Sequence, residues 1–177
     1  MTDFPYKTLV FRTIIVCSCL GASLPSLAKG KPSPTKKQCD DALVATTDVN
    51  LKFGTFEGTP AGTITVSPLG GRSSSGLIFV GGIFSVATFS VYSTIDGCNI
   101  HPVKITLPKN NKPSDLTGVG TVMEASSFTS DPANNFAIDA SANVSTQVNV
   151  GATLTTNVLQ AGGAYTTVTP FTVKFKY

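Results

Sequence analysis

The sequence has no tryptophan, a single histidine and few charged residues. Asp, Glu, Lys and Arg make up 13% of the 177 residues, and the formal net charge is +3. That share is about half of what soluble domains usually carry. The polar surface must therefore come largely from Ser, Thr and Asn, which suit strands and turns better than long helices.

Recognisable catalytic motifs are also missing. His101 is the only histidine, and it precedes Pro102, which favours extended backbone. No Gly-x-Ser-x-Gly turn is present to expose a nucleophilic serine. Residues 71–76 (GRSSSG) have the spacing of a phosphate-binding loop, but Leu77-Ile78 follows them instead of Lys-Ser or Lys-Thr. We therefore expect no enzyme, no catalytic residue, no cofactor and no metal site.

The N-terminus has the features of a secretory signal peptide. Lys7 and Arg12 precede the apolar stretch 13–24, which is too short to span a bilayer. Ser26-Leu27-Ala28 offers small residues to a signal peptidase. We expect cleavage after Ala28, with residues 1–28 as signal peptide, and export to the periplasm, followed by display at the cell surface or secretion.

Cleavage there would leave two of the four cysteines in the mature chain. A lipoprotein acylated at Cys17 or Cys19 is the weaker alternative, because Val16 and Cys17 are poor residues just before such a site. Cys39 and Cys98 then have only each other, and an oxidising compartment favours a disulfide. Closing a loop of 98 − 39 = 59 positions would stabilise the fold by about 4 kcal/mol. Two buried free thiols are the alternative.

Residues 29–38 (KGKPSPTKKQ) are basic and contain no apolar alternation, and we expect a flexible, solvated leader. A patch for phosphate or a membrane surface is the alternative. Four lysines without interleaved aromatics are too few for nucleic-acid binding. Beyond Ala28 no run is long enough to span a membrane. The closest, Leu77–Tyr92, is broken by Gly, Ser and Thr and predicts a buried strand.

From residue 39 onward the sequence alternates as β strands do. The alternating segments are 49–53, 64–66, 84–91, 103–107, 119–128, 144–154 and 165–177. About seven strands at short spacing, with no convincing helical period, predict a single antiparallel two-sheet β-sandwich domain over residues 39–177.

The last of these strands has one apolar face. Its apolar residues are Phe171, Val173, Phe175 and Tyr177, with Thr172, Lys174 and Lys176 between them. This alternation predicts a strand whose one face is buried. A closing strand of this kind normally needs a neighbour on both edges, and the residues alone do not say what pairs with it.

Six short stretches together resemble a bacterial secreted family, the domain of unknown function numbered 4402. In chain order they are 51–56 (LKFGTF), 62–73 (GTITVSPLGGRS), 89–91 (FSV), 105–108 (ITLP), 150–154 (VGATL) and 162–165 (GGAY). The order and spacing of the stretches carry the resemblance, which covers roughly residues 45–177.

That family is similar in turn to the pilins of archaic chaperone–usher fimbriae, the spore-coat-U-like group. The shared features here are Cys39 ahead of Phe53-Gly54, Cys98 near mid-chain, and a closing Gly-x-Tyr strand. The resemblance implies an Ig-like sandwich that lacks one strand, and a partner fills the groove by strand addition. The residues expected to form one wall of that groove are Phe171, Val173, Phe175 and Tyr177. A complete sandwich with an ordinary edge strand is the alternative.

The resemblance also suggests a function. The partners would be a periplasmic chaperone and then a neighbouring pilus subunit, and the ligand a host surface or glycan. A polymerising pilin carries its donor strand ahead of the first cysteine, where this chain has residues 29–38, whose Lys and Pro suit no apolar pocket. We therefore expect an adhesive or structural fimbrial subunit at the tip or in a minor position. The alternative is a free-standing secreted or periplasmic β-sandwich binding domain.

Overall fold

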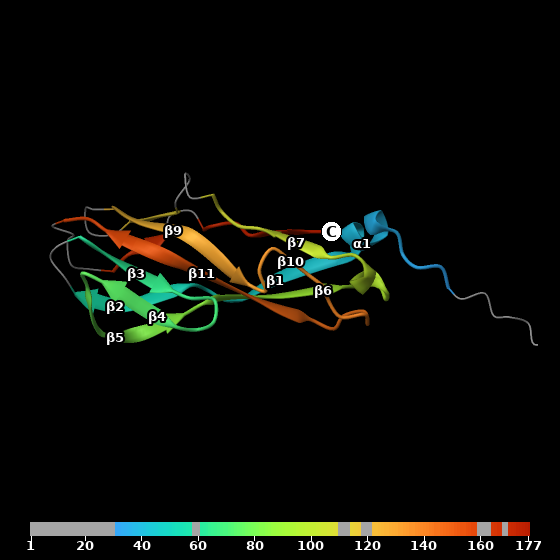
Figure 1. Ribbon diagram of the computed structural model, residues 1–177, viewed down its shortest axis with the longest axis horizontal. Coiled ribbons are helices and arrows are strands. Elements are labelled where there is room, and N and C mark those ends of the chain that lie inside the picture. The colour runs from blue at the N-terminus through green and yellow to red at the C-terminus, as the bar shows by residue number, and fades with distance from the viewer. Residues whose placement is uncertain (1–30, 58–60, 110–113, 118–121, 159–163, 168–169) are drawn as a thin grey trace, which may run out of the picture. The chain divides into compact units, whose positions relative to one another are not determined.

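The computed structural model describes residues 31–57, 61–109, 114–117, 122–158, 164–167 and 170–177. The expected signal peptide lies outside the described residues. Pro32–Tyr177 form one compact unit. The elements described there are almost all antiparallel β strands (Figure 1), which confirms the all-β fold.

A short helix, α1 (Lys36–Ala42), precedes the strands. The side chain of Thr35 accepts a hydrogen bond from the backbone N–H of Gln38, and the Gln38 side chain accepts one from Thr35 N–H, so the two residues form a capping box. The interpretation of residues 29–38 as a leader without structure is therefore wrong from Lys36 onward. Seven residues are too few to show a helical period, and only the Thr-x-x-Gln spacing could have predicted this helix.

The described residues form strands β1 to β13, which are more than the seven expected. Their bounds are β1 Leu43–Val49, β2 Lys52–Glu57, β3 Gly62–Val66, β4 Arg72–Ser75, β5 Ile78–Ser85, β6 Ala87–Ser93, β7 Val103–Thr106, β8 Ser114–Thr117, β9 Val122–Asp131, β10 Asn135–Phe136, β11 Thr146–Thr156, β12 Thr166–Thr167 and β13 Lys174–Lys176. A short 3₁₀ helix, η1 (Cys98–Ile100), lies between β6 and β7.

The strands form three sheets. The main sheet has the order β1-β6-β11-β9-β8-β12, with β3 beside β11 and β4 beside β3. The small sheet has the order β10-β7-β13, and β2 pairs with β5 in a two-stranded ribbon. Within the described residues no helix is long and apolar enough to cross a membrane.

The stretch predicted as one buried strand, Leu77–Tyr92, forms two strands instead. Val86 separates β5 from β6, and Gly81 and Gly82 have positive φ angles within β5. Among the described strands β5 pairs only with β2, and Ile78 is 71% exposed and Ile83 is 79% exposed. Apolar composition alone does not reveal whether a second layer covers a strand, which is why the prediction of burial was wrong for β5.

Strand β11 is the centre of the main sheet. One of its edges pairs first with β6, as far as Val150, and then with β3, beginning at Ala152. Gly151 lies at this change of partner, and a Cβ there would collide with the carbonyl oxygen of Val66. The glycine lets two strands share one edge, which lengthens the sheet without a further layer.

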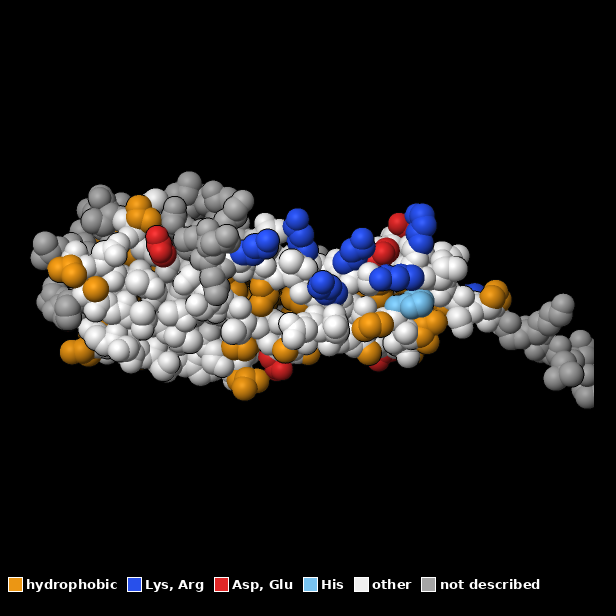
Figure 2. Space-filling model, turned by 45° about the horizontal axis from the view of Figure 1, so that its top comes forward, with side chains coloured by type: hydrophobic (Ala, Val, Ile, Leu, Met, Phe, Trp, Pro, Cys, Tyr) orange, Lys and Arg blue, Asp and Glu red, His pale blue; other side chains and the backbone are white. Residues whose placement is uncertain are grey.

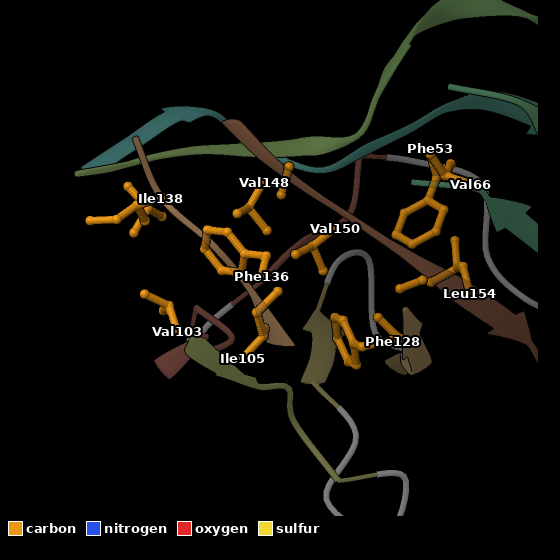
Figure 3. Packing of buried hydrophobic residues seen from close by; sticks show 14 of the residues in the cluster. Phe53, Val66, Val103, Ile105, Phe128, Phe136, Ile138, Val148, Val150 and Leu154 are labelled. Carbon is orange, nitrogen blue, oxygen red and sulfur yellow. The ribbon is translucent and has the colours of Figure 1, made fainter. Parts of the chain in front are cut away.

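The core lies between the main sheet and the small sheet (Figure 3). Val148 and Val150 of β11 are fully buried and face Phe136 of β10. Val103 and Ile105 of β7 belong to the same cluster of buried residues. Burial of each such side chain contributes about 1.5–3 kcal/mol. Two facing antiparallel layers with an apolar interior confirm the sandwich architecture.

Candidate functional site

The last strand is an edge of the small sheet. Strand β13 pairs antiparallel with β7, Phe175 lying opposite Ile105 and Lys176 opposite Lys104. Among the described strands, β7 is its only neighbour. The strand is shorter than expected, because residues 170–173 make no ladder pairing and residues 168–169 lie outside the described part.

The apolar side chains of this last segment lie over the main sheet. Phe171 packs on Phe128 of β9, with ring centroids 4.9 Å apart. Phe175 meets Phe89 of β6 edge to face at 5.7 Å. Phe171 and Phe175, like Val173 between them, are only partly buried although they pack against the core. The predicted apolar face is present, and its cover is incomplete.

Tyr177 is the exception, since it is buried and held at both its backbone and its ring. Its backbone N–H donates to Asp40 Oδ1 of α1 at 2.9 Å, which places the C-terminal end of the chain beside α1 (Figure 1). Its ring lies edge to face with His101, 6.3 Å between centroids. The Tyr177 hydroxyl is buried without a hydrogen-bond partner in the described part. Burial, and then the charge of Asp40, raise the pKa of Tyr177 to about 12.

Strand β1 is the corresponding edge of the main sheet, and its core-facing side is open. Ala45 lies opposite Val91 of β6, and Thr47 lies opposite Phe89, so each pair shares one face of the sheet. Val91 and Phe89 face the interior together with Val148, which is fully buried. Ala45 and Thr47 face the same way and are exposed. No described strand of the small sheet covers them.

We call the space bounded by Ala45, Thr47, Phe89 and Phe175 the partner-strand site. Strand β13 is an edge strand of the small sheet, and its Phe175 contacts Phe89 of β6. In the main sheet, β1 lies beyond β6 as the edge strand. Sequence reasoning found Phe175 but missed Ala45 and Thr47, because Ala-Thr-Thr-Asp carries no apolar alternation. The uncovered face became visible only through the register of β1 on β6.

The outer face of the small sheet is basic. Lys104, Lys174 and Lys176 are exposed there, and Lys104 and Lys176 are directly opposite each other. Figure 2 shows Lys and Arg side chains spaced along one face of the molecule, with apolar side chains visible at the surface beneath them.

The remaining candidates from the sequence have structural roles. Cys39 of α1 and Cys98 of η1 form a disulfide and are both fully buried, which confirms the predicted pair. His101 Nε2 forms an ordinary hydrogen bond with the carbonyl oxygen of Pro34, at 3.2 Å. In the part of the chain that the structure describes, no three His, Cys, Asp or Glu side chains lie close enough together to hold a metal ion.

A family model described as "Domain of unknown function (DUF4402)" matches residues 43–177, from the first residue of β1 to the last residue described. The chain belongs to this family. No curated protein and no solved structure matches the chain. The match covers the residues of the sandwich, and the family's description assigns no activity to them.

Proposed function

We propose that this DUF4402 chain is a fimbria-like structural or adhesive surface subunit whose sandwich is completed by a strand from a partner. The observation that carries the proposal is the open core-facing side of β1, where Ala45 and Thr47 are exposed beside the buried Val91. An uncovered interior face next to an unpaired edge strand is the arrangement that β-strand addition uses.

The added strand would pair with β13 and lie over β1. Its inward side chains would contact Thr47 and the partly buried rings of Phe89 and Phe175. Each apolar side chain that becomes fully buried contributes about 1.5–3 kcal/mol, which offsets part of the cost of association. Backbone hydrogen bonds to the free edge of β13 would fix the register.

The partners that fit this role are a periplasmic chaperone first and a neighbouring pilus subunit afterwards. Export by a signal peptide, residues 1–28, would bring the chain to them. A host surface or a glycan would be the ligand of the assembled subunit. The proposal places the chain at the fimbrial tip or in a minor position, because residues 29–35 carry Lys and Pro, and Lys36–Ala42 are helical. Such a segment is a poor donor strand.

The experiment is a titration of the mature chain with a donor peptide of alternating Val and Ser. At a peptide concentration 100 times the Kd, the free energy of unfolding should rise by about 2.7 kcal/mol. A scrambled peptide of the same composition is the control. A cooperative transition that neither peptide shifts would reject strand addition. Fibres formed by the purified chain alone, seen by size-exclusion chromatography, would reject the tip position.

The alternative is a free-standing secreted or periplasmic binding domain with a complete fold. The Tyr177 end of the chain favours it, because Tyr177 is 4% exposed and already tied to Asp40 without any partner. The same titration separates the two functions. A domain that is complete alone unfolds at the same denaturant concentration with or without the Val-Ser peptide.

A further inference from the structure

The outer face of the small sheet holds like charges in direct opposition. Lys176 of β13 lies directly across from Lys104 of β7, and Lys174 occupies the next outward position on β13, opposite Thr106. All three lysines are exposed. Like charges directly opposite each other on neighbouring strands destabilise the pairing. The pairing of β13 with β7 therefore carries an electrostatic cost.

Among the described residues, none of these lysines forms an ion pair with an acidic side chain. The salt bridge found in that part of the chain joins Lys37 and Asp41, within α1. Asp40 lies at the Tyr177 end of β13, where its Oδ1 accepts the Tyr177 N–H. The cross-strand row that starts at Asn135 and continues through Lys104 ends at Lys176, on the free edge. The next position of that row belongs to whatever strand pairs with β13.

We propose that the strand received at the partner-strand site alternates apolar side chains, facing inward, with acidic side chains, facing outward beside Lys174 and Lys176. This inference rests on the proposed function and adds the chemistry that selects the partner. Lys174 and Lys176 are two positions apart, which is the spacing of outward residues on any strand. Acidic residues there lie within reach of both lysines, directly across or on the diagonal.

The chain's own N-terminal segment does not have the acidic residues expected of the partner strand. Residues 29–35, which precede the helix α1, carry two lysines and no acidic residue. Placed along β13 of another copy, this segment would add positive charge beside Lys174 and Lys176. Charge therefore disfavours self-association through this site and favours a strand of different sequence.

The test uses three peptides with the same inward valines and with Glu, Ser or Lys at the outward positions. Their Kd values for the mature chain are measured at about 30 mM and about 500 mM salt, because surface attraction is screened at the higher ionic strength. At low salt we expect the Glu peptide to bind about tenfold more tightly than the Lys peptide, with the Ser peptide between them. At high salt the three affinities should converge.

Two variants check that the lysines cause the preference. The double substitution Lys174→Glu and Lys176→Glu should invert the order, so that the Lys peptide binds best. Lys52→Glu, an exposed lysine on β2 in the separate ribbon, should leave the order unchanged. Thermal unfolding without peptide confirms that both variants are folded.

The outcomes separate the inference from the function on which it rests. If all three peptides bind equally at low salt, or the Lys peptide binds best to the natural chain, the acidic partner is rejected and strand addition stands. If no peptide binds, both are rejected. Anionic phosphatidylglycerol vesicles are tested in parallel. Vesicle binding that the double variant abolishes, together with equal peptide affinities, would assign the lysines to a lipid surface and overturn the inference.

Discussion

Thr47 of β1 and Phe89 of β6 are cross-strand partners that face the same layer of the sandwich, yet only Phe89 has a side chain of the small sheet over it. Phe175 provides that cover, at 5.7 Å between ring centroids. Thr47 is exposed, so the core-facing side of β1, at the edge of the main sheet, is open there. A sheet face that is open on one strand and closed on the next is where an added strand gains apolar burial and backbone pairing together.

Substitution of Thr47 by lysine should block an added strand without harming the free domain. Thr47 is exposed, so Thr47→Lys should change the free energy of unfolding by less than about 0.5 kcal/mol. In the complex the ammonium group would lie under the inward side chains, where desolvation is costly. We expect at least a tenfold loss of affinity for the Val-Ser peptide, measured by calorimetry.

Thr46→Lys is the matched control. Thr46 is also exposed, but it lies opposite Ser90 on the other face of β1. It should bind the peptide as the natural chain does. Equal loss of affinity in the two variants would mean that the strand does not lie over the core-facing side of β1.

Removal of the Phe175 ring should destabilise even the free domain. The ring is partly buried, packs against the core and meets Phe89 edge to face. Substitution of a fully buried phenylalanine by alanine lowers the free energy of unfolding by about 3–5 kcal/mol. Because Phe175 is only partly buried, we expect a loss of about 1–3 kcal/mol for Phe175→Ala. Urea denaturation measures it. Lys174→Ala, on the outward face of the same strand, should change stability little; a comparable loss there would show that backbone propensity dominates.

The sequence predicts a strand of this fold well where apolar alternation marks its buried face, and poorly where only its apolar composition is visible. Strand β11 was predicted within two residues because Val148, Val150 and Leu154 alternate along a strand buried between neighbours. Strand β5 was predicted as buried because its residues are apolar, and Ile83 is instead exposed. Periodicity reports which residues share a face, and only the tertiary pairing decides whether that face is covered.

The candidate site divides in the same way. Alternation predicted Phe171, Val173 and Phe175 as an apolar face, and the family resemblance implied their role as a groove wall. Phe171 and Phe175 contact the main sheet, and Val173 packs against the core. The other wall, Ala45 and Thr47, left no apolar pattern, because it is a wall only through its register on β6. The like-charge pair of Lys104 and Lys176 was equally invisible, since the two residues are distant in sequence and become neighbours by pairing.

The disulfide should supply a large part of the domain's stability. It joins Cys39 of α1 to Cys98 of η1 across a sequence separation of 59 residues. The loop-closure estimate is about 4 kcal/mol for the variant with Cys39→Ser and Cys98→Ser. Urea denaturation with and without dithiothreitol measures it. The reductant should destabilise the natural chain and leave the variant unchanged; a natural chain insensitive to dithiothreitol would contradict a stabilising role.

The buried Tyr177 hydroxyl should make the domain sensitive to alkali. Burial raises the pKa of Tyr177 from 10.0 to about 12. Between these values the unfolded chain loses the phenol proton and the folded chain keeps it, so the free energy of unfolding falls as pH rises from 10 toward 12. Below pH 10 the contribution is fully present. Denaturation at stepped pH values measures the slope.

Tyr177→Phe removes only this hydroxyl and so isolates its contribution. The hydroxyl has no hydrogen-bond partner among the described residues, so near pH 7 the variant should be as stable as the natural chain or up to about 1 kcal/mol more stable. Above pH 10 the natural chain should lose stability faster than the variant. Parallel pH profiles would show that the phenol reaches water in the folded state, and would leave Asp40 as the anchor of the chain end through the Tyr177 backbone alone.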